Sequence, residues 1–332
     1  MNTKNVLMAN RLFIMLFAFA ITFTSCNSDD DSTSQNYVPS STAFNSIRQA
    51  ALEDMTQTFQ IDGASGMTTL TSANGVEIDI NANCLTLNGN AVTGQIDIEY
   101  VEVFDGGQML VTDKTTMGKL PNGDMAMIIS GGEFYINATK NGQQLDLGCT
   151  MNLRIPANLT APDNDMVLWN GTVDNEGNLD WEEEVNTVGQ GGVFLEQGAG
   201  GGQTYFAFFN SFGWTNVDKF YNYVGLKTQI LAAVPSGYNF QNSAIYLHYD
   251  GEGNALAKLD TYDANTGLFS EHYGQIPVGL ACHIIFATEE NGQWRYAIKP
   301  VTISENAVYT FTIAETTVGS EAQLIAAINA LP

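Results

Sequence analysis

The feature that most constrains the fold is a period of two in the hydrophobic residues. In the stretch GVEIDI, Val76, Ile78 and Ile80 fall on one face of an extended chain, while Glu77 and Asp79 fall on the other. Short runs of this kind recur along the sequence, separated by Asn-Gly and other glycine-containing turns. Short strands joined by such turns pair in antiparallel sheets. The sequence therefore predicts an all-β protein built from sandwiches.

One strand departs from strict alternation. In QIDIEYVEV, residues 95–103, the apolar positions are Ile96, Ile98 and Tyr100, and the phase then shifts to Val101 and Val103. An extra residue in one strand of a pair produces such a shift, so a β-bulge is predicted near Tyr100.

Helical spacing is found near the two ends of the globular region. Residues 43–57, AFNSIRQAALEDMTQ, place apolar residues on one helical face, which predicts a short N-terminal helix. The stretch SEAQLIAAINALP within 317–332 does the same, with Ser320 as its expected N-cap.

The predicted fold is all-β, with two antiparallel β-sandwich-like domains, a short N-terminal helix and a short C-terminal helix. Glycine clusters, GQGG and GAGGG, mark a hinge or long hairpin between the domains, because glycines this dense cost backbone entropy when ordered. The predicted segments are a signal peptide at 1–25, an acidic tether at 26–42, a helix at 43–57, a first sandwich at 58–160, a glycine-rich linker or hairpin region at 161–204, a second sandwich at 205–316 and a C-terminal helix at 317–332.

The N-terminus has the composition of an export signal. Lys4 and Arg11 precede an uncharged run from Leu12 to Thr24. This run is shorter than the ~20 residues that a helix needs to cross a bilayer. It therefore predicts a removable secretory signal.

The residues Phe23, Thr24, Ser25 and Cys26 resemble the lipobox of bacterial lipoproteins, although Phe23 stands where Leu is usual. The resemblance implies that the Cys26 thiol becomes a diacylglyceryl thioether at the new N-terminus. Each buried CH₂ of an acyl chain contributes ~0.8 kcal/mol, so two or three chains hold firmly. The expected membrane contact is through this lipid.

Three aspartates at positions 29–31 follow Cys26 after Asn27 and Ser28. The acidic run resembles the export signal of Bacteroidota lipoproteins that reach the outer face of the outer membrane, and Asp31-Ser32-Thr33 resembles an O-glycosylation site of that phylum, with Ser32 as the acceptor. The resemblance implies a cell-surface location. A plain solvated acidic linker is the alternative.

Two longer stretches resemble modules of uncharacterised Bacteroidota surface lipoproteins. The first runs from TSANGVEIDINANC through GNAVTGQIDIEYVEVFD to LRIPAN, and its first hairpin is also similar to the ZU5 β-sandwich, which implies protein contacts. The second contains FGWTNVDKFY, which resembles the Gly-Trp-Ile-Asn-x-Asp-Arg-Phe motif of these lipoproteins. The stretch that follows, from TGLFSEHYGQIPVG to VYTFTI, is similar to the prealbumin-like regulatory domain of carboxypeptidases. This resemblance implies no active site.

The charge balance excludes one class of partner. The net charge is −24, and loss of Lys4 and Arg11 with the signal makes it −26. A polyanion repels phosphate, so nucleic acid is not an expected partner, whereas glycans and surface proteins remain open.

Three cysteines follow the lipobox. The odd number leaves at least one of Cys84, Cys149 and Cys282 unpaired. Cys84 and Cys149 fall in one predicted domain and could pair, but buried free thiols are the favoured expectation. No Cys/His spacing predicts a zinc site.

The residues that carry catalytic chemistry show no recognisable arrangement. His283 shares a face with Ile285 and is expected to be a hydrogen-bonded interior residue, and His248 lies on another strand. His272 is expected in a loop, and the acidic turn DGEGN at 250–254 reads as a hairpin turn. The prediction is no enzyme, no metal and no cofactor. The alternative is a surface glycoside hydrolase with a carboxylate pair from distant strands.

Aromatic residues are concentrated between positions 205 and 223. Aromatic faces stack on sugar rings, so Trp214, Tyr221 and Tyr223 are candidate ligand-binding residues for a glycan. Packing in the interior is the favoured explanation of this aromatic run, because Phe206 and Phe208 alternate with Tyr205, Ala207 and Phe209 as in an interior strand. The predicted function is a lipid-anchored outer-membrane lipoprotein with a non-catalytic binding or scaffolding role toward protein or glycan.

Overall fold

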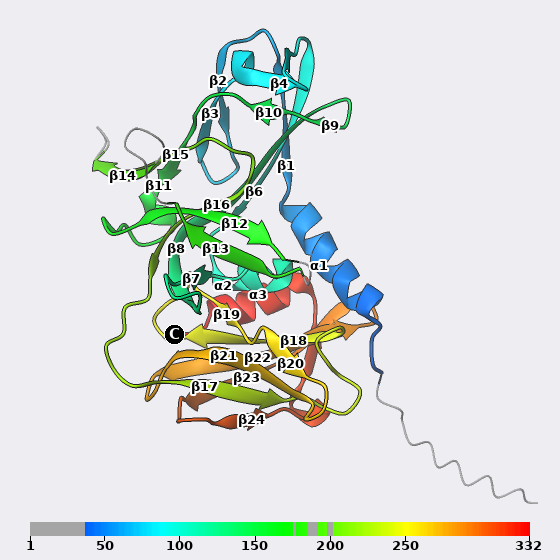
Figure 1. Cartoon of the computed structure of the whole chain (residues 1–332). Coiled ribbons are helices and arrows are strands. Elements are labelled where there is room, and N and C mark those ends of the chain that lie inside the picture. The colour runs from blue at the N-terminus through cyan, green and yellow to red at the C-terminus, as the bar shows by residue number, and fades with distance from the viewer. Residues whose placement is uncertain (1–36, 175–176, 185–191, 198–201) are drawn as a thin grey trace, which may run out of the picture. The chain divides into compact units, whose positions relative to one another are not determined.

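The computed structural model describes residues 37–174, 177–184, 192–197 and 202–332 (Figure 1). The predicted signal peptide, Cys26 and Ser32 lie outside the described residues. Among the helices of the described ranges, none has both the length and the apolar composition needed to cross a bilayer.

The first sandwich is built from two large sheets and one small one. Its core lies between the five-stranded sheet and the β1–β6–β8 part of the eight-stranded sheet, and includes Ile78, Ile98, Leu153 and Tyr205. The eight-stranded sheet contains β1 (Gln57–Asp62), β6 (Gln95–Val103), β8 (Met125–Lys140), β16 (Gly213–Phe220), β12 (Val167–Val173), β13 (Leu179–Glu183), β7 (Met117–Lys119) and β9 (Gln143–Gln144). The five-stranded sheet contains β14 (Gly192–Gln197), β15 (Gln203–Phe209), β11 (Met151–Pro156), β3 (Glu77–Asn81) and β2 (Met67–Thr71), and the small sheet contains β10 (Asp146–Leu147), β4 (Leu85–Leu87) and β5 (Asn90–Ala91).

Part of the eight-stranded sheet closes on itself. The strand β7 pairs with both β13 and β8, so the order β8–β16–β12–β13–β7 returns to β8 as a ring of five strands. Trp169 and Trp181 lie in the apolar cluster at this ring with no exposed surface. A side chain at Gly118 would lie 2.6 Å from Ile128 and 3.0 Å from Trp169, so only glycine leaves room for the indole there.

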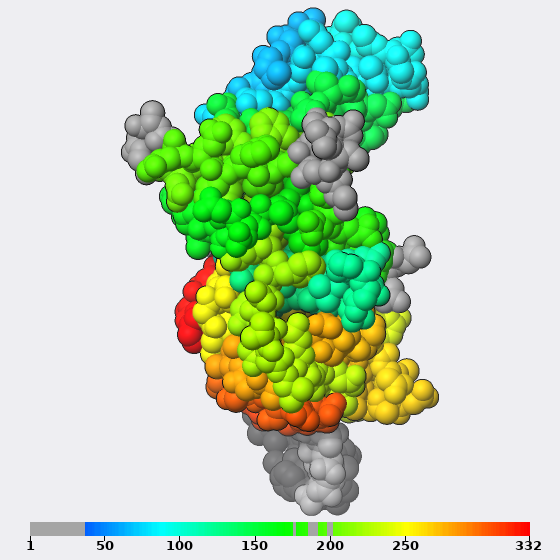
Figure 2. Space-filling view, turned by 60° about the vertical axis from the view of Figure 1, so that its left-hand side comes forward, coloured from blue at the N-terminus to red at the C-terminus, as the bar shows by residue number. Residues whose placement is uncertain are grey.

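The second sandwich consists of a four-stranded and a five-stranded sheet. Ile230, Leu247, Ile284 and Phe286 are among the buried residues of its core. The sheets contain β20 (Thr261–Asp263), β21 (Leu268–Pro277), β17 (Lys227–Ala233) and β24 (Val308–Thr310), and β19 (Ala257–Lys258), β18 (Ser243–Tyr249), β22 (Ala281–Glu290), β23 (Gln293–Thr302) and β25 (Thr317–Gly319). The predicted all-β fold with two sandwiches is confirmed. In Figure 2 the blue to green residues of the first sandwich and the yellow and orange residues of the second lie toward opposite ends of the view.

The boundary predicted at residue 205 is wrong. The strands β12, β13 and β14 lie in the region expected to be a linker, β15 crosses the predicted boundary, and β16 lies in the region expected to open the second sandwich. All five belong to sheets of the first sandwich. The reason is a long-range pairing, because β16 adds to the long strand β8 with Asp218 opposite Ser130. The glycine clusters from which the linker was predicted do not indicate this pairing.

Three helices pack against the first sandwich and the β18–β22–β23 sheet, two of them between the sandwiches and the N-terminal one along their side (Figure 1). They are α1 (Ser41–Met55), α2 (Gly106–Thr112) and α3 (Glu321–Asn329). Their apolar side chains, including Phe44, Leu110 and Ile328, form one cluster with residues of β6, β18 and β22. The N-terminal and C-terminal helices were predicted, and the Ser320 N-cap is confirmed because its hydroxyl accepts from the Gln323 amide. The helix α2 was not predicted.

The helical layer explains why the bulge predicted near Tyr100 is wrong. The strand β6 pairs with β8 without a register shift. Tyr100 faces the core of the sandwich and Val101 faces the helices, so both are buried on opposite sides of one regular strand. A strand that is covered on both faces carries apolar residues on both, so its sequence no longer alternates between apolar and polar residues.

The last residues of the predicted tether belong to the folded unit. The Tyr37 hydroxyl donates to Glu289 at 2.7 Å, Asn242 donates to the carbonyl of Pro39, and Ser40 caps α1. The predicted extent of the tether to residue 42 is therefore wrong for residues 37–42, because these contacts hold the chain against the second sandwich.

Cys84 and Cys149 form a disulfide with their Cα atoms 5.7 Å apart, so the expectation of free thiols is wrong for this pair. The Gly148 amide donates to the Cys84 carbonyl at 2.8 Å, and this contact aligns the two chain segments. Cys282 is a buried free thiol, as expected.

Candidate functional site

Trp214 lines a hollow of about 620 Å³ beside α1. It lies directly opposite Tyr135 on the paired strands β16 and β8, and directly opposite residues share a face of the sheet. Their ring centroids are 5.3 Å apart at 45°. The Lys114 ammonium lies 5.7 Å from the Trp214 ring. The hollow is lined by Gln49, Leu52, Glu53, Thr56, Thr58, Glu99, Val101, Lys114, Tyr135, Val173 and Trp214.

Two further hollows continue along α1. One of about 210 Å³ shares Gln49, Leu52 and Lys114 with the first. It shares Asn45 and Arg48 with a third of about 250 Å³. Because neighbouring hollows share their lining side chains, they form one depression along the helix. We call it the α1 groove.

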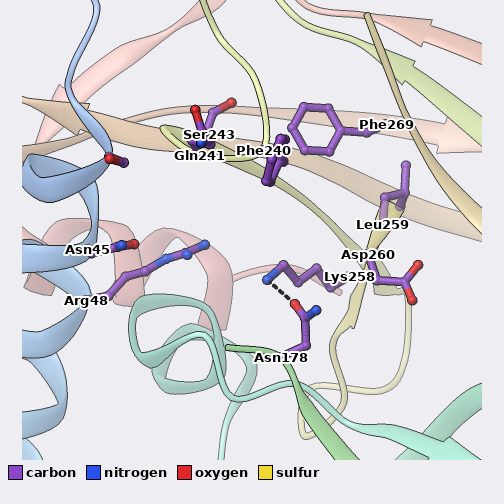
Figure 3. Close-up of a pocket in the computed structure, with 11 residues that line it drawn as sticks. Asn45, Arg48, Asn178, Phe240, Gln241, Ser243, Lys258, Leu259, Asp260 and Phe269 are labelled. Atoms are coloured by element: carbon purple, nitrogen blue, oxygen red, sulfur yellow. Dashed lines mark hydrogen bonds between the residues drawn. The ribbon is translucent and has the colours of Figure 1, made fainter. Parts of the chain in front are cut away.

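Figure 3 shows the third hollow, where side chains from α1 face those of β19 and the following residues. Asn45 and Arg48 project from α1, and Lys258 faces them with its ammonium bonded to Asn178 at 2.8 Å. Phe240 closes one side, with 56% of its surface exposed. This end of the α1 groove therefore combines cations, amides and one open aromatic face.

A buried ion cluster holds this end of the α1 groove in place. The Asp113 carboxylate pairs with Arg48 at 3.1 Å and Lys258 at 2.9 Å, and accepts from the Tyr246 hydroxyl at 2.6 Å. Burial acts to raise the pKa of Asp113, but the charges of Arg48 and Lys258 outweigh it and lower the pKa to about 2. Asp113 therefore stays ionised and fixes both cations.

Two carboxyl groups lie in the interior without any exposed surface. They are Glu133 on β8 and Asp218 on β16. Burial raises the pKa of Glu133 well above its usual value, and burial together with the charge of Glu133 does the same for Asp218. A carboxyl pair of this kind suits acid–base chemistry, but with no exposed atom neither group can reach a substrate.

The three aromatic residues predicted to bind a ligand do not come together. Trp214 lines the α1 groove, whereas Tyr221 packs against Tyr249 at 5.2 Å in the second core. The Tyr223 hydroxyl donates to the carbonyl of Val278. The aromatic partner of Trp214 is Tyr135, which sequence reasoning missed because it lies on another strand.

The histidines occupy three environments. His283 is hydrogen-bonded to Asp250 as expected, but it is partly buried rather than interior, with 13% of its side chain exposed. His248 lies directly opposite His283 in the sheet, which no spacing along the chain indicated. His272 is on the strand β21 rather than in a loop, with 47% of its side chain exposed.

Comparison of the chain with protein-family models, with curated proteins and with solved structures finds no match in any of the three.

Proposed function

We propose that this chain is a lipid-anchored lipoprotein of the outer membrane, exposed at the cell surface, that binds a glycan in the α1 groove without catalysing a reaction. The lipobox ending at Cys26 and the acidic run after it support the location. The observation that carries the binding role is the tilted pair of Trp214 and Tyr135 in the largest hollow of the groove.

The chemistry of the groove suits an oligosaccharide. Aromatic faces contact the C–H faces of sugar rings. Next to them, Gln49, Glu53 and Glu99 offer amide and carboxylate groups to sugar hydroxyls. The volume of about 620 Å³ lies within the range of about 300–1,000 Å³ typical of ligand sites. The hollows that follow along α1 extend this surface for a chain of several sugars.

The distribution of positive charge also favours the α1 groove over other surfaces as the glycan-binding site. Lys114, Arg48 and Lys258 line it. Only ten lysines and arginines remain after the predicted signal is removed, so three of them gather at one depression of an otherwise acidic chain. They provide contacts for a sugar that bears a carboxylate.

Glycan binding is tested by replacing Trp214 with alanine. Wild-type protein is titrated by calorimetry with cellohexaose, xylohexaose and oligogalacturonate. Binding of at least one of these is expected, with roughly tenfold or greater weakening in Trp214→Ala, as for loss of a central aromatic contact. The matched control is Phe194→Ala, which removes an aromatic residue with 56% exposure outside the groove, and it should bind like the wild type.

Failure of the wild type to bind any of these probes would contradict the glycan role and leave a surface protein as the partner. Equal binding by Trp214→Ala would move the site out of the groove. Hydrolysis of chromogenic glycosides by the purified protein would contradict the non-catalytic role and favour a glycoside hydrolase.

The lipid anchor makes a separate prediction. In cells fed a labelled fatty acid, the wild-type protein is expected to carry the label and to be removed by protease shaving of intact cells. Cys26→Ser should lose the label, whereas Cys282→Ser should keep it, because the buried Cys282 thiol is remote from the processing site in sequence. Label on Cys26→Ser, or full protection from the protease, would contradict the proposed anchor or its orientation.

A further inference from the structure

Three potential metal ligands meet at one end of the β18–β22 pair. His248 and His283 are direct partners in this antiparallel pair, so their side chains lie on the same face of the sheet. Asp250 follows β18 by one residue, and its amide donates to the Ala281 carbonyl at 3.1 Å. This turn brings the carboxylate back toward both rings. One ligand atom from each of the three residues lies within 4.8 Å of the others.

The cluster contains a buried polar atom with no partner. The Nδ1 atom of His248 makes no hydrogen bond, although only 1% of that side chain is exposed. A buried polar atom without a partner costs about 1–3 kcal/mol. The nearest carboxylate oxygen, Asp250 Oδ1, is 3.9 Å away, which is too far for a hydrogen bond. A cation bound by His248 Nδ1 and Asp250 would give this nitrogen a partner.

The ligand atoms lie at separations near those of a metal site, although the contact of Asp250 with His283 is also that of a hydrogen bond. In a tetrahedral zinc site with bonds of ~2.0–2.1 Å, neighbouring ligand atoms are ~3.4 Å apart. Asp250 Oδ1 is 2.7 Å from His283 Nδ1 and 3.9 Å from His248 Nδ1, values on either side of that spacing. Side-chain rotations that lengthen the first separation and shorten the second would bring Asp250 Oδ1 to that spacing from both nitrogens.

The donor set selects the class of ion. Two imidazole nitrogens and one carboxylate oxygen suit zinc and related transition metals, whereas calcium and magnesium prefer oxygen ligands. Asp250 and His283 keep 22% and 13% of their side chains exposed, so an ion can enter from solvent on their side. Three protein ligands leave a fourth position for water or another ligand.

We propose that His248, Asp250 and His283 form a binding site for a divalent transition metal, with zinc as the best-fitting ion. The site joins the ends of β18 and β22 at the turn that follows β18. It is distinct from the α1 groove, since none of the three residues lines a hollow of that groove.

The test uses protein purified without a polyhistidine tag and treated with EDTA. Zinc is titrated in competition with a chromogenic chelator, and Co²⁺ is added separately to read the visible d–d bands of its coordination. The wild type is expected to bind one zinc ion per chain and to melt at a higher temperature with zinc than without it. His283→Ala and Asp250→Ala should weaken zinc binding by roughly tenfold or more. Loss of a residue that only hydrogen-bonds a metal ligand already lowers affinity by about tenfold, and loss of a ligand itself should cost at least as much.

The matched control is His272→Ala, which removes the exposed histidine outside the cluster and should bind zinc like the wild type. Melts of the metal-free variants separate loss of binding from loss of folding. The site is refuted if the wild type binds no zinc at micromolar concentration. It is equally refuted if folded His283→Ala and Asp250→Ala proteins bind zinc as tightly as the wild type.

Discussion

Replacing Asp113 with alanine is expected to lower the free energy of unfolding by about 3–5 kcal/mol, the usual cost of breaking a buried ion pair from one side. The change would leave Arg48 and Lys258 as uncompensated charges with only 14% and 16% of their side chains exposed. It would also remove the acceptor of the Tyr246 hydroxyl. Urea denaturation of both proteins at neutral pH measures the difference.

The Asp113 carboxylate also makes the stability of the protein depend on pH. Its pKa is about 2 in the folded protein against an ordinary 3.8, so it stabilises the folded state above about pH 4. That contribution is lost as the pH falls from about 4 through about 2. The wild type should therefore lose stability across this window more steeply than Asp113→Ala.

The exposed pair of Lys119 and Glu182 provides the control for Asp113, with 47% and 60% of the side chains exposed. Glu182→Ala should cost less than about 1 kcal/mol, since surface ion pairs contribute little. A cost for Asp113→Ala no greater than that of Glu182→Ala would show that the cluster does not hold the helices and β19 together.

Removal of the Cys84–Cys149 disulfide is expected to lower the free energy of unfolding by about as much as Asp113→Ala does. The two residues are 65 positions apart in the sequence, and a crosslink that closes a loop of this length stabilises by about 4 kcal/mol in the chain-entropy description. The double variant Cys84→Ser, Cys149→Ser should therefore unfold at a lower urea concentration than the wild type.

A reducing agent is the internal control for the disulfide. It should lower the stability of the wild type toward that of the double variant and leave the double variant unchanged. Equal stability of wild type and double variant under oxidising conditions would mean that the bond does not constrain the unfolded chain.

Local patterns predicted the elements that depend on local interactions. The alternation of Ile78 and Ile80 gave a strand, and the helical spacing before and after the sandwiches gave α1 and α3 with their boundaries within a few residues. These features follow from the repeat of the backbone itself. The class of fold was predictable for the same reason.

The features that failed all depend on which distant segments pair. The addition of β16 to β8 moved the domain boundary, and the cover of helices on β6 removed the expected bulge at Tyr100. The pairing of Trp214 with Tyr135 and of His248 with His283 follows from sheet register, which a single sequence does not specify. The candidate site was therefore predictable only for Trp214 within the α1 groove.

The long strand β8 has an evolutionary consequence. It pairs with β6, β16, β7 and β9, and the five-stranded ring closes through it. A recombination event between residues 204 and 205 would divide β15 and separate β16 from β8, which leaves unpaired strand edges in both products. A module boundary at the predicted position therefore cannot preserve the first sandwich, whereas the segment between β16 and β17 follows the last strand of its sheets.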